Sequence, residues 1–215
     1  MDQILEFFNR LRDVKALVQW GGYVGLTAII FAETGLVFGF FLPGDSLLVT
    51  AGLLASQPQF GLNVYLLGAI LTAAAIIGDA VGYWIGRMSG PRLFKREASL
   101  FFKPKYLRQA ADFYERHGGK TIVIARFMPI VRTFVPVVAG AAGMAYSRFT
   151  FFNIFGGIFW IWSMLFTGYF LGRYIPGVDE HIEIVIIVVV LLSISPGIYH
   201  WWKSSRASAP ERQNT

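Results

Sequence analysis

The sequence predicts an all-α integral membrane protein. Of its 215 residues, 55% are hydrophobic and 16% are aromatic, and the mean hydropathy is positive. Long apolar runs alternate with short polar stretches, and several of the runs carry single charged residues. A charged residue at bilayer depth normally faces a cavity or a partner. Together these features are typical of polytopic membrane proteins, in which each spanning helix needs roughly 20 apolar residues.

Residue types that build most enzyme sites are missing or scattered. The sequence contains no cysteine, which excludes disulfides and thiol chemistry. Its three histidines do not have metal-ligand spacing, and we find no nucleophile–histidine–acid arrangement or glycine-rich phosphate loop. We therefore expect no enzymatic activity, no metal and no cofactor.

The N-terminal part predicts a surface helix that leads into a membrane segment. Residues 1–17 are charged and amphipathic, which favours an interfacial helix over a cleaved signal peptide. Residues 18–32 are apolar but short for a complete span. They either cross the membrane or form the first arm of a hairpin.

Residues 29–55 predict a re-entrant hairpin with acidic side chains near its tip. The segment is apolar enough for a bilayer but contains Glu33 and Asp45. Pro43 lacks an N–H and disfavours helical geometry in the residue before it, so Pro43 and Gly44 should break the helix. Broken backbone is tolerated at membrane depth only where it is buried in protein or lines water.

A transmembrane helix and a basic loop follow. Residues 62–85 form an apolar run that includes Asp79. Residues 87–120 contain nine Lys or Arg and three acidic residues, so Arg87 together with the basic loop at residues 88–120 accounts for the whole net charge of +6. Positively charged loops normally stay on the cytoplasmic side, and the apolar flanks argue against nucleic-acid binding.

A second broken segment comes after the loop. Residues 121–144 are apolar but contain Arg126 and Arg132 together with Pro129 and Pro136. Prolines in a helix interior remove hydrogen bonds and kink the chain, so this segment should not be an ordinary span. We expect a second re-entrant hairpin with helix breaks at the two prolines.

Two further spans and a tail complete the chain. Residues 149–171 and 182–202 are long apolar runs that predict transmembrane helices. Residues 204–215 are polar and predict a short disordered tail. A single membrane domain, residues 18–203, therefore follows the N-terminal surface helix, and its last helix is additional to the repeat described next.

A repeated pattern relates the two halves of this domain. The sequence GYWIGR at residues 82–87 matches GYFLGR at residues 168–173, and each copy ends a predicted span. The halves, about residues 23–87 and 116–173, would each consist of a hairpin and a helix. One copy of the motif meets the basic loop and the other an acidic loop, which predicts an inverted repeat of the kind found in secondary transporters.

The charges of the two hairpins are complementary. If their tips meet, Glu33 and Asp45 would neutralise Arg126 and Arg132 and offset part of the desolvation cost. Guanidinium groups bind phosphate through paired hydrogen bonds, so the arginines are candidate ligands for a lipid phosphate. Desolvation favours the neutral form of a carboxyl group, so the acids are candidate proton carriers. The alternative is a static cluster in which Asp45 only caps the following helix.

Three further residues have two interpretations each. Asp79 either takes part in coupling or simply reaches the membrane interface. Asn153 and Trp160 either line the site or pack helices together, and packing is the simpler interpretation. Four glycines should allow helices to approach closely: Gly140, Gly143, Gly156 and Gly157.

Five stretches together resemble the bacterial DedA family, which is related to the eukaryotic VTT-domain proteins. They are FAETGL, FLPGDSLL, GDAVGYWIGR, HGGKTIVIARFMPIVRTFVPVVAG and FFNIFGGIFW, and the similarity covers about residues 20–200. The resemblance implies two opposed re-entrant hairpins and movement of membrane lipids, with proton dependence in some members. It places the family's essential acids at Glu33 and Asp45 and its essential arginines at Arg126 and Arg132.

The resulting expectation is a lipid flippase or scramblase of the bacterial inner membrane. Undecaprenyl phosphate is the first candidate substrate and a phospholipid such as phosphatidylethanolamine the second, with protons as coupling partner. Residues 87–120 and the C-terminus should be cytoplasmic. The alternatives are a proton-coupled carrier of a small anion and a structural factor in membrane homeostasis. A homo-oligomer is compatible with the sequence.

Overall fold

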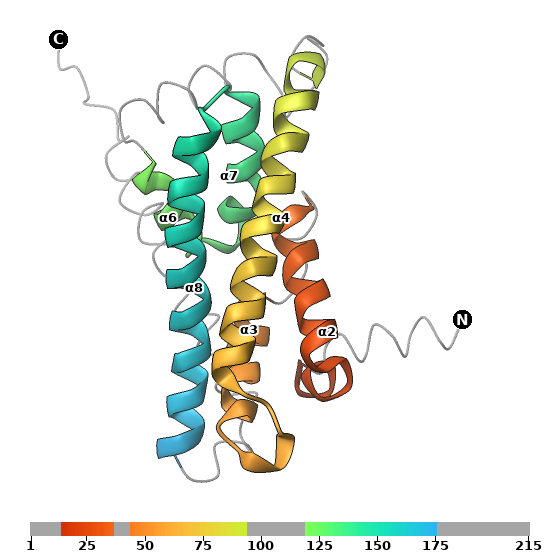
Figure 1. Ribbon diagram of the computed structural model, residues 1–215, viewed down its shortest axis with the longest axis vertical. Helices are drawn as coiled ribbons and strands as arrows, with labels where there is room; N and C mark the ends of the chain where they lie inside the picture. Colours follow the sequence, from red (N-terminus) through yellow and green to blue (C-terminus); the bar gives the residue numbers. More distant parts are fainter. Residues whose placement is uncertain (1–13, 37–43, 94–118, 176–215) are drawn as a thin grey trace, which may run out of the picture.

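Two long helices run the length of the computed structural model, which describes residues 14–36, 44–93 and 119–175 (Figure 1). They are α4 (Val64–Leu93) and α8 (Tyr146–Tyr174). Residues 64–89 of α4 and the whole of α8 are long and apolar enough to cross a membrane. The spans predicted at residues 62–85 and 149–171 are therefore confirmed as continuous helices.

The first hairpin segment consists of two separate helices. α2 (Val14–Gly35) bends at Gly22, whose φ of 50° and ψ of −147° are not helical. α3 (Gly44–Ala55) has 12 residues, which corresponds to about 18 Å at the usual rise per residue. This length is too short to cross the hydrocarbon core of a bilayer. A short 3₁₀ helix, η2 (Pro58–Phe60), connects α3 to α4.

The second hairpin segment is also divided into two short helices. α6 (Lys120–Ala125) is followed by its capping residue Arg126, and α7 (Pro129–Ala141) begins three residues after Arg126. Proline is favourable at a first helical position because the missing N–H would have no intrahelical partner there. The predicted break at Pro129 is confirmed, whereas the predicted break at Pro136 is wrong because α7 continues through it.

Pro136 lies within α7 at a close contact with α4. An interior proline loses one backbone hydrogen bond and crowds the preceding turn. The residue that faces its ring on α4 is Gly82, where an added Cβ would lie 3.3 Å from Cβ of Pro136. A glycine at this point leaves the room that the ring needs, so α7 packs closely on α4 in spite of its proline.

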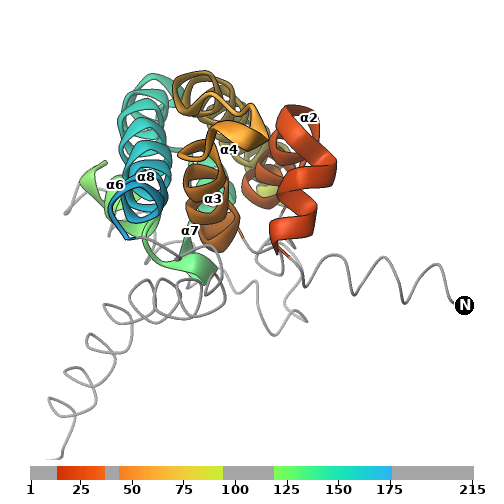
Figure 2. The same ribbon diagram turned by 90° about the horizontal axis from the view of Figure 1, so that it is seen from below.

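The helix contacts are reciprocal between the two halves. The short helix α3 packs on α8, and the short helix α7 packs on α4 (Figures 1 and 2). A Cβ on Gly52 or Gly168 would lie 2.0 or 1.9 Å from a backbone oxygen across the α3–α8 contact. A Cβ on Gly86 or Gly140 would lie 2.0 Å from one across the α4–α7 contact. Each half therefore packs its short helix on the long helix of the other half.

The outer faces of α4 and α8 carry large apolar side chains. An exposed apolar surface of this kind is typical of a membrane-contacting face. The exposed residues include Tyr65, Ile77, Trp84, Phe151, Phe155, Phe159 and Phe170.

Several predicted segments lie outside the described residues. They are residues 1–13 of the expected surface helix, Pro43, most of the basic loop, the span at residues 182–202 and the tail at residues 204–215. Among the four glycines expected at helix contacts, Gly143 differs from the prediction. It lies just after α7 with φ 76° and with open space around the position of a Cβ.

Candidate functional site

Among the residues that the structure describes, five charged side chains from both halves of the chain are buried in the bundle, each with 7% of its surface exposed or less. They form two groups. The Arg132 cluster consists of Glu33, Asp45, Arg132 and Trp160, and the Arg126 cluster consists of Asp79, Arg126 and Asn153. The two groups are close enough to interact electrostatically.

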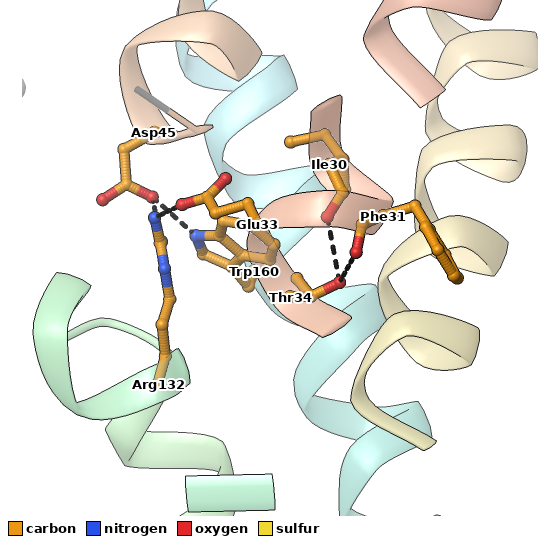
Figure 3. Close-up of polar contacts among 7 residues, drawn as sticks. All are labelled: Ile30, Phe31, Glu33, Thr34, Asp45, Arg132 and Trp160. Carbon is orange, nitrogen blue, oxygen red and sulfur yellow. Dashed lines mark hydrogen bonds and ion pairs between the residues drawn. The ribbon is translucent and has the colours of Figure 1, made fainter. Parts of the chain in front are cut away.

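In the Arg132 cluster, one arginine holds two acids from the other half of the chain (Figure 3). Arg132, in the first turns of α7, donates through Nη2 to Glu33 and through Nη1 to Asp45. Glu33 lies in the last turn of α2, and Asp45 lies in the first turn of α3. Because α3 already begins at Gly44, Asp45 is a helical residue and not the cap that the static interpretation assumed.

Trp160 of α8 completes this cluster. Its Nε1–H donates to Oδ1 of Asp45 at 2.9 Å, and its ring lies 4.5 Å from the guanidinium carbon of Arg132. This separation is within the range of a cation–π contact. The indole is fully buried. Its role in the cluster goes beyond the helix packing that we considered the simpler interpretation.

The second carboxylate oxygen of Glu33 lies against the start of α3. Among the described residues, Oε2 of Glu33 has no hydrogen-bond partner. A Cβ on Gly44 would lie 1.7 Å from this oxygen. Gly44 is therefore needed for the space that it leaves as well as for the helix break that the sequence predicted. The positive end of the α3 dipole also favours a carboxylate at this position.

In the Arg126 cluster, an arginine at a helix end is held between the two long helices. Arg126 directly follows α6 and donates through Nη2 to Asp79 of α4 and to Asn153 of α8. Asn153 in turn donates to the carbonyl of Ile76 at 3.0 Å. Asp79 is 4% exposed and paired with Arg126, so the interpretation that it reaches the membrane interface is wrong.

Two glycines of α8 make room for the Arg126 side chain. A Cβ on Gly156 would lie 3.0 Å from both Cδ and Nε of Arg126, and one on Gly157 would lie 3.6 Å from Nη1. We predicted that this glycine pair lets neighbouring helices approach α8 closely. The pair also lets the Arg126 side chain lie against α8. Larger residues at these positions would push Arg126 away from α8.

The predicted meeting of acids and arginines is correct for Arg132 and incomplete for Arg126. Arg132 pairs with both Glu33 and Asp45, and Arg126 pairs with Asp79 instead. The signal for Asp79 was present in the sequence, because a carboxylate in the middle of an apolar span requires a partner. Trp160 had no such signal, since α8 is rich in aromatic residues.

The chemistry available at this site is that of cations and carboxylates. Arginine donors can bind an anion such as phosphate, and carboxyl groups can bind a proton. Within the part of the chain that the structure describes, there is no group of three or more His, Cys, Asp or Glu side chains that could hold a metal ion.

Comparisons with known proteins agree with a membrane location. Residues 42–170 match the VTT domain. The chain is 46% identical to Protein DedA of Escherichia coli K12, over 97% of this chain and 95% of that protein. It is 43% identical to an uncharacterized membrane protein of Mycobacterium tuberculosis H37Rv (81% and 76% covered) and 37% identical to the inner membrane protein YghB of E. coli K12 (80% and 78% covered). No solved structure matches the chain.

Proposed function

The chain belongs to the DedA family of VTT-domain membrane proteins, and on that premise we propose that it moves a phosphate-bearing lipid across the membrane. The observation that carries the proposal is the burial of Arg126 and Arg132 on either side of a helix break. Both point their donors at carboxylates. A bundle that needed only apolar packing would not require two buried arginines at a broken helix.

Phosphate fits these arginines because its oxygens can replace the carboxylate oxygens that they now hold. A planar guanidinium forms paired hydrogen bonds with either group. The Nε atoms of Arg126 and Arg132 are buried and have no hydrogen-bond partner among the described residues. Each arginine therefore has a further donor for an anion.

A lipid is the favoured source of the phosphate because the site lies between helices whose outer faces are apolar. The head group would enter between the two clusters while its tails remain beside the exposed aromatic residues of α8. Undecaprenyl phosphate is the first candidate and a phospholipid such as phosphatidylethanolamine the second. A free inorganic anion would use the same donors, so the transport experiment below includes one.

An inverted repeat with re-entrant hairpins is the architecture that we propose for this transport. The reciprocal packing of α3 on α8 and of α7 on α4 supports it. In both copies of the repeated motif, the arginine donates to the tyrosine hydroxyl one turn earlier, at 2.9 Å for Arg87 and 3.4 Å for Arg173. Such a repeat would let the same site face either side of the membrane in turn.

Coupling to protons is the second part of the proposal. Three buried acids face two arginines, so one bound proton would make the site electrically neutral. We expect lipid movement by the wild-type protein to respond to an imposed pH gradient, and we expect Glu33→Gln to abolish this response because glutamine cannot ionise. The measurement is the rate at which a fluorescent phospholipid changes leaflet in reconstituted vesicles, with and without the gradient.

The same vesicles separate the proposal from its alternatives. Uptake of radioactive inorganic phosphate without lipid movement would support a small-anion carrier instead. A wild-type rate that ignores the gradient would reject coupling and leave passive scrambling. If Glu33→Gln moves lipid at the wild-type rate under a pH gradient, Glu33 does not take part in proton coupling.

The membrane orientation gives a further prediction. If the basic loop is cytoplasmic, the end of α4 and the start of α8 face the cytoplasm, and η2 faces the outside (Figure 1). Gln59 and Ser147 are exposed at these opposite ends. Because the chain contains no cysteine, Gln59→Cys in intact cells should react with an impermeant thiol reagent, and Ser147→Cys should react after lysis. The reverse pattern would contradict the proposed orientation.

A further inference from the structure

Trp160 contacts both partners of one ion pair through different parts of its side chain. The indole N–H bonds to Asp45, and the ring face lies on the guanidinium of Arg132 (Figure 3). The three residues come from α8, α3 and α7. A tryptophan that only filled space between helices would not need this double contact.

The two contacts have different consequences when the ion pair opens. The contact of Arg132 with the indole ring is a cation–π contact and involves no oxygen acceptor, so the guanidinium remains able to donate to an anion. The indole N–H, in turn, gives Asp45 a donor that does not depend on Arg132. Each partner therefore keeps one contact if the other partner leaves, and a buried polar group without any partner is strongly unfavourable.

We propose that Trp160 is a positioning residue of the lipid phosphate site, one that keeps Arg132 oriented and Asp45 hydrogen-bonded while Arg132 passes from carboxylate to phosphate. This inference rests on the proposed function and adds a residue to it. Trp160 would keep both groups in place without occupying the Arg132 donors that the phosphate requires.

The surrounding face of α8 supports the same role. Asn153, Gly156, Gly157 and Trp160 are spaced at i, i + 3, i + 4 and i + 7, so they lie on one face of the helix, and all four are buried. Asn153 accepts a hydrogen bond from the guanidinium of Arg126, and the two glycines leave room for the Arg126 side chain. One face of α8 thus positions both arginines.

Trp162 provides a matched control on the same helix. Its ring packs on Tyr65 and Phe166 and against Gly68. Trp162→Phe therefore makes the same chemical change among apolar neighbours. If Trp160 only packs helices, the two phenylalanine variants should behave alike.

The first test measures the rate of lipid movement against the mole fraction of a fluorescent phospholipid in vesicles. Trp160→Phe keeps an aromatic face but loses the N–H, so we expect the maximal rate to fall about tenfold, as for the loss of a hydrogen bond to a charged group. The half-saturating mole fraction should stay nearly constant. Trp160→Leu also loses the face and should raise the half-saturating mole fraction, while Trp162→Phe should match the wild type. Wild-type kinetics in Trp160→Phe, or an equal loss in Trp162→Phe, would overturn the inference.

The second test does not depend on transport by a variant. The protein is labelled with 5-fluorotryptophan, and the ¹⁹F signal of Trp160 is assigned by its loss in Trp160→Phe. Adding dodecyl phosphate should shift this signal, and adding uncharged dodecyl maltoside should not. Binding of dodecyl phosphate is followed separately as inhibition of lipid movement. Inhibition without a shift would reject the role of Trp160, and absence of inhibition would reject the phosphate site itself.

Discussion

Replacing Arg132 by glutamine is expected to abolish the proposed lipid transport and to lower the free energy of unfolding by about 3–5 kcal/mol. Arg132 pairs with Glu33 and Asp45, and all three side chains are almost completely buried. Without the guanidinium, two carboxylates would face each other in a desolvated site. Thermal unfolding in detergent and the vesicle assay would measure the two effects on the same preparation.

A triple variant separates the loss of stability from the loss of function. Glu33→Gln and Asp45→Asn, combined with Arg132→Gln, remove every charge of the Arg132 cluster at similar volume. Because uncharged replacements of buried ion pairs are often neutral for stability, the melting temperature should recover most of the loss while transport remains absent. Arg173→Gln is the control: this exposed arginine should change the free energy of unfolding by no more than about 0.5 kcal/mol.

The triple variant also decides between a transport site and a static cluster. A cluster that only joins the two hairpins would be replaced adequately by neutral hydrogen-bonding groups. Transport by the triple variant at the wild-type rate would therefore support the static interpretation. An unchanged melting temperature in Arg132→Gln would show instead that the ion pairs of Arg132 do not stabilise the folded protein.

The fold could be predicted where apolar length alone decides the structure. The spans at residues 62–85 and 149–171 were predictable because a predominantly apolar run of this length has few alternatives. The broken segments were less predictable, because a proline has opposite effects at different positions. Pro129 starts a helix and Pro136 lies within one, where it packs close to Gly82 of a distant helix.

The site could be predicted as a set of charges but not as a set of pairs. Charged side chains in apolar segments with a helix break were recognisable as candidates because burying a charge is energetically unfavourable. These residues are Glu33, Asp45, Arg126 and Arg132. Their partners depend on which helices lie side by side, and the pair of Arg126 with Asp79 joins residues 47 positions apart. This pairing follows from the packing of α4 beside α8 and the break at Arg126, which local sequence patterns do not encode.

A single added methyl group at Gly44 should strongly reduce the proposed lipid transport. In Gly44→Ala the Cβ would lie 1.7 Å from Oε2 of Glu33, so the carboxylate would have to leave its place beside Arg132. The backbone at Gly44 does not have positive φ, so alanine is otherwise acceptable there and should be well tolerated in a helix. We expect transport to fall at least about tenfold, the equivalent of about 1.4 kcal/mol, while the protein still inserts into the membrane.

The cause of this loss can be tested by making room for the methyl group. Glu33→Asp shortens the acid by one CH₂, so the double variant Glu33→Asp, Gly44→Ala should transport better than Gly44→Ala alone. Gly25→Ala is the control in α2, because a Cβ there would meet no neighbouring atom within 4 Å, and it should retain wild-type transport. A fully active Gly44→Ala would mean that Glu33 can move without consequence. The pairing of Glu33 with Arg132 would then be unnecessary for transport, and proton coupling would have to reside in Asp45 or Asp79.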